Sequence, residues 1–194
     1  MISFKDKYFQ KKSRPDLSQP PIYGVAQLQI PKEDINNMLE EIEPLSKTLA
    51  KGITTFPEEQ HMRSVKNAQI NTDGFVGNVL REVAIKFNQS FNYKVDDISQ
   101  VEYMEYGKGD FYNMHSDVSD GLSAKRKISI SLILNVGEFV GGDLAFKQGD
   151  EEVAVDLRHF NCFGFTSFLQ HRVTPITSGR RKVIVAWVTG EEWR

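Results

Sequence analysis

The strongest constraint on the fold is a change in sequence pattern near residue 95. From there the chain breaks into short runs rich in β-branched and aromatic residues, separated by glycine and polar residues, which is typical of strands and turns. A long series of such runs indicates an antiparallel sandwich or barrel. The runs are VEYMEYG, KISISLILN, DLAFKQG, EEVAVDL, NCFGFTSFLQH and RKVIVAWVTG. We therefore expect a double-stranded β-helix, which is a jelly-roll form, over residues 96–194.

Two glycine-containing pairs mark expected hairpin turns within this series. Gly141-Gly142 and Gly149-Asp150 stand where the chain would reverse between strands. Glycine tolerates the positive φ that tight hairpin turns require. Both pairs are predicted to connect neighbouring strands.

The N-terminal half has helical periodicity instead. Apolar residues recur at i, i+3, i+4 and i+7 in two stretches, one ending near Pro44 and one following Asp73-Gly74. They are Ile35, Met38, Leu39 and Ile42, and then Val76, Val79, Leu80, Val83 and Phe87. The fold class is therefore predicted as α+β, mainly β. We expect a single domain over residues 1–194, in which residues 1–95 supply supporting helices and the first strands.

Composition excludes several classes of function. The formal charge of −2 provides no overall field that would attract nucleic acid or an anionic membrane. The single cysteine, Cys162, excludes an internal disulfide and a multi-cysteine metal site, and it fits a reducing compartment. No apolar run reaches the roughly 20 residues of a membrane span, and the first residues lack the apolar block of a secretory signal. We expect a cytoplasmic protein with no membrane partner; its oligomeric state is left open.

The stretch NMHSDV contains the first candidate metal ligands. His115 and Asp117 are two positions apart, so they point to the same side of an extended chain. Two histidines and one carboxylate on one face of a metal leave other positions open, as in non-haem iron(II) oxygenases. His171, at the end of the run NCFGFTSFLQH, is a better third ligand than His159 in a turn-like link, and His61 is expected at the surface. A lone H-x-D is weak evidence, because Asp117 could merely cap a turn.

A wider set of motifs carries a family resemblance. The segment YGKGDFYNMHSD, then GGDLAF, then HRVTPI and the arginine ten residues after its histidine resemble the 2-oxoglutarate and iron(II)-dependent oxygenases. The resemblance is to the prolyl-4-hydroxylase-like branch and covers roughly residues 95–190; the segment RSVKNAQI is similar to a strand that precedes the barrel. It implies Fe(II) held by His115, Asp117 and His171, with 2-oxoglutarate and O2 as cosubstrates and ascorbate as a compatible reductant.

The resemblance also implies contacts to the cosubstrate. Arg181 would pair with the distal carboxylate of 2-oxoglutarate, since a guanidinium offers a two-pronged match. Tyr106 would donate its hydroxyl to the same group. Separately from the resemblance, the alternation of KISISLILN places Ser129 and Ser131 on one face, where small hydroxyl side chains would leave room for a cosubstrate and donate hydrogen bonds to it. Other interpretations stay open: a basic cluster at a sheet edge for Arg181, a core aromatic for Tyr106, and a water-facing strand face for the serines.

The implied reaction is hydroxylation of a substrate C–H bond, with release of succinate and CO2. A peptidyl proline in a protein or peptide is the preferred substrate, with Tyr112 and Arg126 on the substrate side. Lys125-Arg126-Lys127 is otherwise read as a solvated strand start. The chain departs from the family pattern where some prolyl hydroxylases have tyrosine at the position of Ile133, and where collagen-type enzymes have lysine at the position of Arg181. A nucleic-acid oxidative demethylase and a non-catalytic cupin-like metal-binding or ligand-binding protein are the alternatives.

Overall fold

The computed structural model describes residues 22–51 and 62–193, which form two long helices, a short 3₁₀ helix and strands in three sheets. The elements of the N-terminal half are β1 (Val25–Leu28), α2 (Lys32–Ser46), β2 (Ala50–Lys51), β3 (Arg63–Ser64), β4 (Lys66–Gln69) and α3 (Phe75–Phe91). The remaining elements are β5 (Val95–Tyr106), β6 (Phe111–His115), η2 (Gly121–Lys125), β7 (Arg126–Ile133), β8 (Phe139–Gly141), β9 (Leu144–Gln148), β10 (Glu151–Ala154), β11 (Cys162–Thr166), β12 (His171–Val173), β13 (Ile176–Gly179) and β14 (Arg181–Gly190).

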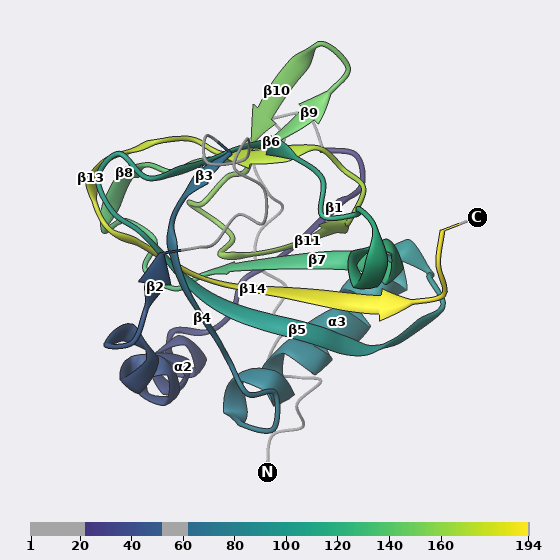
Figure 1. Ribbon diagram of the computed structural model, residues 1–194, viewed down its shortest axis with the longest axis horizontal. Coiled ribbons are helices and arrows are strands. Elements are labelled where there is room, and N and C mark those ends of the chain that lie inside the picture. Colours follow the sequence, from purple (N-terminus) through teal and green to yellow (C-terminus); the bar gives the residue numbers. More distant parts are fainter. Residues whose placement is uncertain (1–21, 52–61, 194) are drawn as a thin grey trace.

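Two antiparallel sheets face each other and form the jelly-roll barrel. The larger sheet has seven strands in the order β1-β11-β7-β14-β5-β4-β2, and the smaller has five in the order β10-β9-β12-β6-β3. A third sheet pairs β8 with β13. In Figure 1 the smaller sheet lies above the larger one, and the hairpin of β9 and β10 projects from the top. The predicted fold class is confirmed.

The two helices cover the outer face of the larger sheet (Figure 1). On β7, Ile128, Ile130 and Leu132 are fully buried, and they join the apolar faces of both helices in one core cluster. Burial of each such side chain contributes about 1.5–3 kcal/mol to the free energy of folding. Both helices were predicted; α2 continues two residues beyond Pro44, which is within the usual uncertainty of a helix end.

The inner face of the larger sheet lines the barrel. Residues that pair across antiparallel strands point to the same side, and Ser131 of β7 is opposite Val185 of β14, while Arg181 is opposite Tyr106 of β5. The alternation predicted for KISISLILN is therefore present, with aliphatic side chains toward the helices and Ser129 and Ser131 toward the barrel interior. Arg180, next to Arg181, faces the other way, where its Nη1 contacts Glu105 Oε2 at 2.6 Å.

The sequence suggested that the run NCFGFTSFLQH is one strand, and this expectation is wrong. The run ends as strand β11 at Thr166, turns, and begins again as β12 at His171 in the opposite sheet. The amide of Leu169 donates to the carbonyl of Thr166 at 2.9 Å, which closes the turn. An apolar run can cross between two sheets because both ends of the crossing remain buried in the barrel.

The two glycine pairs have different roles. Gly149-Asp150 is a two-residue hairpin turn, since Gln148 of β9 is paired with Glu151 of β10 and Gly149 has φ +66°. The hairpin predicted at Gly141-Gly142 is wrong. Both glycines have positive φ, but β8 before them pairs with β13 and β9 after them pairs with β10 and β12. This connection crosses between sheets instead of joining paired strands.

The segment RSVKNAQI is also divided between sheets. Arg63–Ser64 pairs with β6 in the smaller sheet, and Lys66–Gln69 pairs with β5 in the larger one, with buried Val65 between them. The N-terminal half thus contributes strands to both walls of the barrel. The single-domain assignment over residues 1–194 stays a prediction. Among residues 22–51 and 62–193, no helix is long and apolar enough to cross a membrane.

Gly164 of β11 tests how tightly α3 packs on the sheet. A Cβ atom at this position would lie 2.2 Å from Cδ2 of Phe87, a fully buried ring on α3. We expect Gly164→Ala to lower the free energy of unfolding by about 1–3 kcal/mol through overpacking. Urea denaturation measures this loss, and it should shrink in the Phe87→Leu background, where a smaller side chain makes room. The control is Gly107→Ala, whose Cβ would meet nothing closer than 3.6 Å; equal losses for both glycines would contradict the packing argument.

Candidate metal centre and cosubstrate cavity

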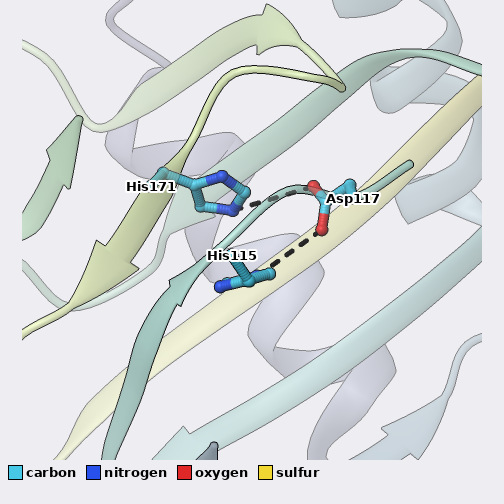
Figure 2. Close-up of side chains that lie close together, drawn as sticks. All are labelled: His115, Asp117 and His171. Atoms are coloured by element: carbon cyan, nitrogen blue, oxygen red, sulfur yellow. Dashed lines mark ion pairs between the residues drawn. The ribbon is translucent and has the colours of Figure 1, made fainter. Parts of the chain in front are cut away.

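Three candidate ligands converge at one end of the barrel (Figure 2). His115 ends β6 and His171 begins β12, and the two residues are directly paired across these neighbouring strands. Asp117 follows β6, and its Oδ1 lies 3.6 Å from Nε2 of His115 while its Oδ2 lies 3.7 Å from Nε2 of His171. One possible ligand atom from each residue lies within 4.8 Å of the others. A single ion can contact all three side chains at this spacing.

Local hydrogen bonds orient both imidazoles. Nδ1 of His115 lies 2.7 Å from the carbonyl oxygen of Asn113, and Nδ1 of His171 lies 2.9 Å from that of Leu169. A carbonyl can only accept, so Nδ1 carries the proton and Nε2 presents a lone pair toward Asp117. This arrangement of a carbonyl behind each imidazole is typical of metal-binding histidines.

The carboxylate of Asp117 is held by the larger sheet. The hydroxyl of Ser129 on β7 donates to Asp117 Oδ2 at 2.5 Å, and Ser129 Oγ lies 3.0 Å from Ser167 Oγ. The amide of Asp117 donates to the carbonyl of Ser167 at 2.9 Å. Ser129, predicted as a cosubstrate contact, is thus placed against a candidate metal ligand. Ser167 was missed, because its partners lie far away in the sequence.

The electrostatics of the cluster suit a cation. Burial by itself would raise the pKa of Asp117, but His171, His115 and the Ser129 hydroxyl act against burial and hold this pKa well below its usual range. Burial lowers the pKa of His171 to about 4, although the charge of Asp117 acts in the opposite direction. At neutral pH the pair therefore offers an anionic oxygen and an unprotonated nitrogen, which are the states that bind metal ions.

A cavity beside the cluster is lined by several of the predicted residues. Tyr106, Tyr112, Ser131 and Arg181 border it together with the three candidate ligands. Arg181 is 1% exposed, and its Nε has no hydrogen-bond partner among the described residues. Its Cζ lies 5.3 Å from the centre of the Tyr106 ring. Burial lowers the pKa of Arg181, and the cavity thus contains a buried cation with an unused donor.

The residues assigned to the substrate side border the same site. The Tyr112 ring stacks on His115 with 3.6 Å between ring centres. The guanidinium of Arg126 lies 4.0 Å above the ring of Trp187, which also lines the cavity, and its Nη1 donates to the carbonyl of Asp117 at 3.2 Å. Burial lowers the pKa of Arg126, while Asp117 and Glu102 act in the opposite direction.

The solvated strand start predicted at Lys125-Arg126-Lys127 is wrong for two of its three residues. Only Lys125 is exposed. Lys127 is 7% exposed, and its Nζ lies 3.7 Å from the centre of the Trp193 ring. Aromatic rings cover the other two cations, which the linear sequence did not indicate. Trp187 could have been found, since it shares the strand face of Arg181.

His159 does not join the cluster. His159 is exposed, and its Nδ1 lies 3.0 Å from Asp156 Oδ2 on the surface. His61 lies outside the described residues. The structure therefore places His171, the third ligand chosen from the sequence, beside His115 and Asp117, and it places the other candidate, His159, elsewhere.

Comparison with known proteins agrees with this geometry. Residues 101–189 match the family model described as the 2OG-Fe(II) oxygenase superfamily. This part of the chain is similar to that superfamily, and it makes up less than half of the 194 residues. It includes all three candidate ligands, the cavity arginine and both predicted tyrosines.

Individual relatives are distant. A PKHD-type hydroxylase of Idiomarina loihiensis is 29% identical over 92 residues, which are 47% of this chain and 42% of that protein. The chain thus spans less than half the length of that relative in the match. A prolyl-4-hydroxylase of Pseudomonas putida has a similar structure, with a TM-score of 0.69 and 20% identity over 87% of this chain and 93% of the other. A Trichoplax adhaerens prolyl hydroxylase, solved with a hypoxia inducible factor peptide fragment, has a TM-score of 0.68 and 17% identity over 86% and 83% of the two chains. These structural likenesses support the jelly-roll fold.

Ser129 and Ser131 provide a matched test of the metal centre. Ser129→Ala removes the hydroxyl that holds Asp117, and loss of such a supporting hydrogen bond lowers metal affinity about 10–100-fold. Ser131→Ala removes a hydroxyl from the cavity wall, whereas the hydroxyl that donates to Asp117 is that of Ser129, so the metal affinity of this variant should stay near that of the unaltered protein. Isothermal titration with Mn²⁺ measures both. Equal affinities for the two variants would show that Ser129 does not support the metal ligand.

Proposed function

We propose that the protein is a 2-oxoglutarate- and Fe(II)-dependent dioxygenase that hydroxylates a C–H bond. The observation that carries the proposal is the buried Arg181, which lines the same cavity as the His115, Asp117 and His171 cluster. Its Nε has no hydrogen-bond partner within residues 22–51 and 62–193. A buried unpaired cation costs several kcal/mol unless a ligand completes it. An anionic cosubstrate beside a metal supplies that partner.

The donor set fits Fe(II). Two neutral imidazoles and one carboxylate on one side of an ion leave the opposite positions open, as in non-haem iron oxygenases. His115, Asp117 and His171 would hold the metal, and the bound metal with 2-oxoglutarate and O2 would supply oxidative decarboxylation to succinate and CO2 coupled to hydroxylation. The chain's own share is to bind, orient and exclude water.

Cavity residues divide this work. Arg181 would bind the distal carboxylate of 2-oxoglutarate, with the Tyr106 hydroxyl as a second donor; that hydroxyl now lies 3.8 Å from Met104 Sδ, a weak acceptor that it can leave at little cost. Ser131 would line the path between metal and arginine. Leu144 and Phe165 form apolar walls that keep water out and strengthen the charge interactions inside. Ser129 would support the metal ligand instead of the cosubstrate.

A peptidyl proline in a protein or peptide is the substrate we propose. The support is the similar Trichoplax structure, which was solved in complex with a peptide fragment, together with the aromatic and cationic wall of Tyr112, Arg126 and Trp187. Aromatic rings suit the apolar pyrrolidine ring, and an arginine can donate to peptide carbonyls. The stretch after Asp117 that contains η2 and the strand β8 would contribute loops around it.

The direct experiment is an assay of the full chain with Fe(II), 2-oxoglutarate and O2. We expect one succinate per 2-oxoglutarate consumed, faster turnover with poly-L-proline or proline-containing peptides, and a gain of one oxygen atom on the peptide by mass spectrometry. Metal binding without any 2-oxoglutarate binding would favour the cupin-like alternative. Turnover stimulated by methylated oligonucleotides, and not by peptides, would favour the demethylase alternative.

Arg181 separates a dioxygenase from a metal-binding barrel. Arg181→Ala leaves the distal carboxylate of 2-oxoglutarate buried without its partner, a loss on the order of 2–5 kcal/mol. At about 1.4 kcal/mol per tenfold, affinity for 2-oxoglutarate should fall roughly thirtyfold or more, while Mn²⁺ affinity barely changes. Isothermal titration of 2-oxoglutarate into the Mn²⁺-loaded proteins measures this.

Arg180→Ala is the matched control for that measurement. Arg180 is exposed and paired with Glu105 on the outer face of the sheet, so its loss should change neither affinity appreciably. Equal 2-oxoglutarate affinities for the unaltered protein and Arg181→Ala would remove Arg181 from the site. A large loss of 2-oxoglutarate affinity in Arg180→Ala instead would mean that the cosubstrate binds at the outer face of β14, contrary to the proposal.

Asp117→Ala tests the carboxylate ligand. We expect the substrate-independent conversion of 2-oxoglutarate to succinate to disappear while the thermal unfolding transition remains cooperative, because two imidazoles bind Fe(II) more weakly and the charge at the metal changes. Succinate is measured by chromatography. Undiminished succinate production would exclude Asp117 as a ligand.

A further inference from the structure

A buried carboxylate lies on the inner face of β5, outside the metal cluster. Glu102 is 7% exposed and accepts hydrogen bonds from three side-chain amides: Asn67 Nδ2 at 2.9 Å, Gln69 Nε2 at 2.8 Å and Gln100 Nε2 at 2.6 Å. We call Asn67, Gln69, Gln100 and Glu102 the amide cluster. The charge of Glu102 also acts on Arg126, where it raises the pKa of the guanidinium against the effect of burial. The hydrogen bonds to Glu102 from the described residues come from these three neutral amides.

The carboxylate determines which way each amide points. An ionised carboxylate only accepts, so all three amide groups must direct their N–H atoms toward Glu102 and their oxygens away from it. The oxygen of Gln100 then faces Arg126, and Nη2 of Arg126 donates to Gln100 Oε1 at 3.0 Å. A chain of two hydrogen bonds therefore joins Glu102 to Arg126 through Gln100.

Arg126 is the point where this chain reaches the site. Its guanidinium lies 4.0 Å from the centre of the Trp187 ring and donates to the Asp117 carbonyl. Gln100 is opposite Trp187 across the pairing of β5 and β14, which puts the amide and the ring on one wall. Trp187 is 6% exposed, and its Nε1 has no hydrogen-bond partner among the described residues. The position of Arg126 thus decides how one face of this ring is covered.

We infer that Glu102 is a positioning residue, which acts through Gln100 to hold Arg126 over Trp187 at the substrate side of the cavity. The role in substrate orientation rests on the proposed function, whereas the hydrogen-bond relay does not. A buried carboxylate among neutral amides adds little stability compared with a well-packed apolar side chain. A fixed guanidinium, by contrast, keeps its remaining donors in one orientation for a ligand carbonyl, which lowers the entropy lost on binding.

The sequence spacing explains why the relay can form. Gln100, Glu102 and Met104 occupy every second position of β5, so their side chains share the inner face of the sheet. Gln69 of the neighbouring strand β4 is directly opposite Glu102. Two adjacent strands supply the acceptor and its donors at neighbouring positions. Arg126, at the first residue of β7, is brought to them only by the sheet.

Trp187 can report the position of Arg126. The chain has two tryptophans, so Trp193→Phe leaves Trp187 as the single one. In that background, acrylamide quenching of Trp187 fluorescence measures how well Arg126 covers the ring, and Arg126→Ala sets the uncovered level. We expect Glu102→Met, which removes the acceptor at nearly constant size, to raise the quenching constant to the level of Arg126→Ala.

Gln100→Glu in the Glu102→Met protein tests the relay specifically. A carboxylate at position 100 can pair directly with Arg126 without help from position 102, so this double variant should return quenching to the level of the parent. A purely packing role of Glu102 would not be rescued by a charge at position 100. Gln100→Leu, which leaves Glu102 with its other two amides, should also raise quenching and decides the matter if Glu102→Met does not fold.

All of these measurements are made on the full chain without iron or 2-oxoglutarate. Failure of the proposed dioxygenase activity would therefore leave their outcome unchanged. Parent-level quenching in folded Glu102→Met or in Gln100→Leu would overturn the inference, because Arg126 would then be held without the relay. Raised quenching that the double variant does not reverse would overturn it as well, since Glu102 would act through packing.

Discussion

The antiparallel pairing of β6 with β12 is the interaction on which the candidate site depends. It sets His115 directly opposite His171, so the two imidazoles lie on one face of the smaller sheet and point into the barrel. A shift of one residue in this register would turn one imidazole to the outside, because side chains alternate along a strand. Asp117 reaches the same point only because the chain leaves β6 immediately after His115. Local carbonyls then set the direction of each Nε2.

Buried charge organises the rest of the barrel interior. The carboxylate of Asp117 lies beside two imidazoles and accepts a hydrogen bond from a serine hydroxyl, and the carboxylate of Glu102 accepts hydrogen bonds from three amides. Arg181 differs from both, since its Nε lies beside a cavity and no residue in the described part of the chain accepts a hydrogen bond from it. A buried charged group whose hydrogen bonds are all satisfied by the protein holds the surrounding structure in place. A buried cation with an unsatisfied donor beside a cavity indicates a binding place for an anionic ligand. This contrast separates the supporting parts of the site from the part that would bind.

The two faces of the larger sheet divide stability from chemistry. The outer face of β7 packs its aliphatic side chains against the helices, and the inner face of the same strand places Ser129 and Ser131 in the site. One strand can serve both purposes because successive side chains point to opposite sides. The close contact between Gly164 and Phe87 shows how near the helix must approach. A rigid outer layer of this kind keeps the inner residues in fixed positions, which a preorganised site requires.

Local pattern was sufficient for the features that depend on periodicity. The two helices, most strands, the alternation of KISISLILN and the strand face of Arg181 follow from spacing in the sequence, because backbone geometry repeats every 3.6 residues in a helix and every two in a strand. The choice of His171 over His159 also came from the sequence, through its place next to an apolar run. The expectations for Gly141-Gly142, for NCFGFTSFLQH as one strand and for Arg126 and Lys127 as solvated residues were wrong. Each of these outcomes depends on tertiary contacts, namely the sheet in which the following strand pairs or the aromatic ring that packs on the side chain.

Contacts between residues distant in the sequence were decided only by the tertiary structure. Ser167 behind Asp117, Trp187 beneath Arg126 and the amide cluster around Glu102 come from strands that become neighbours when the barrel closes. The sequence by itself determined which residue types stand on which face of each strand. The order of strands in the two sheets determined which of those faces meet, because hydrogen-bond pairing between strands is set by the closure of the whole barrel and not by any short segment.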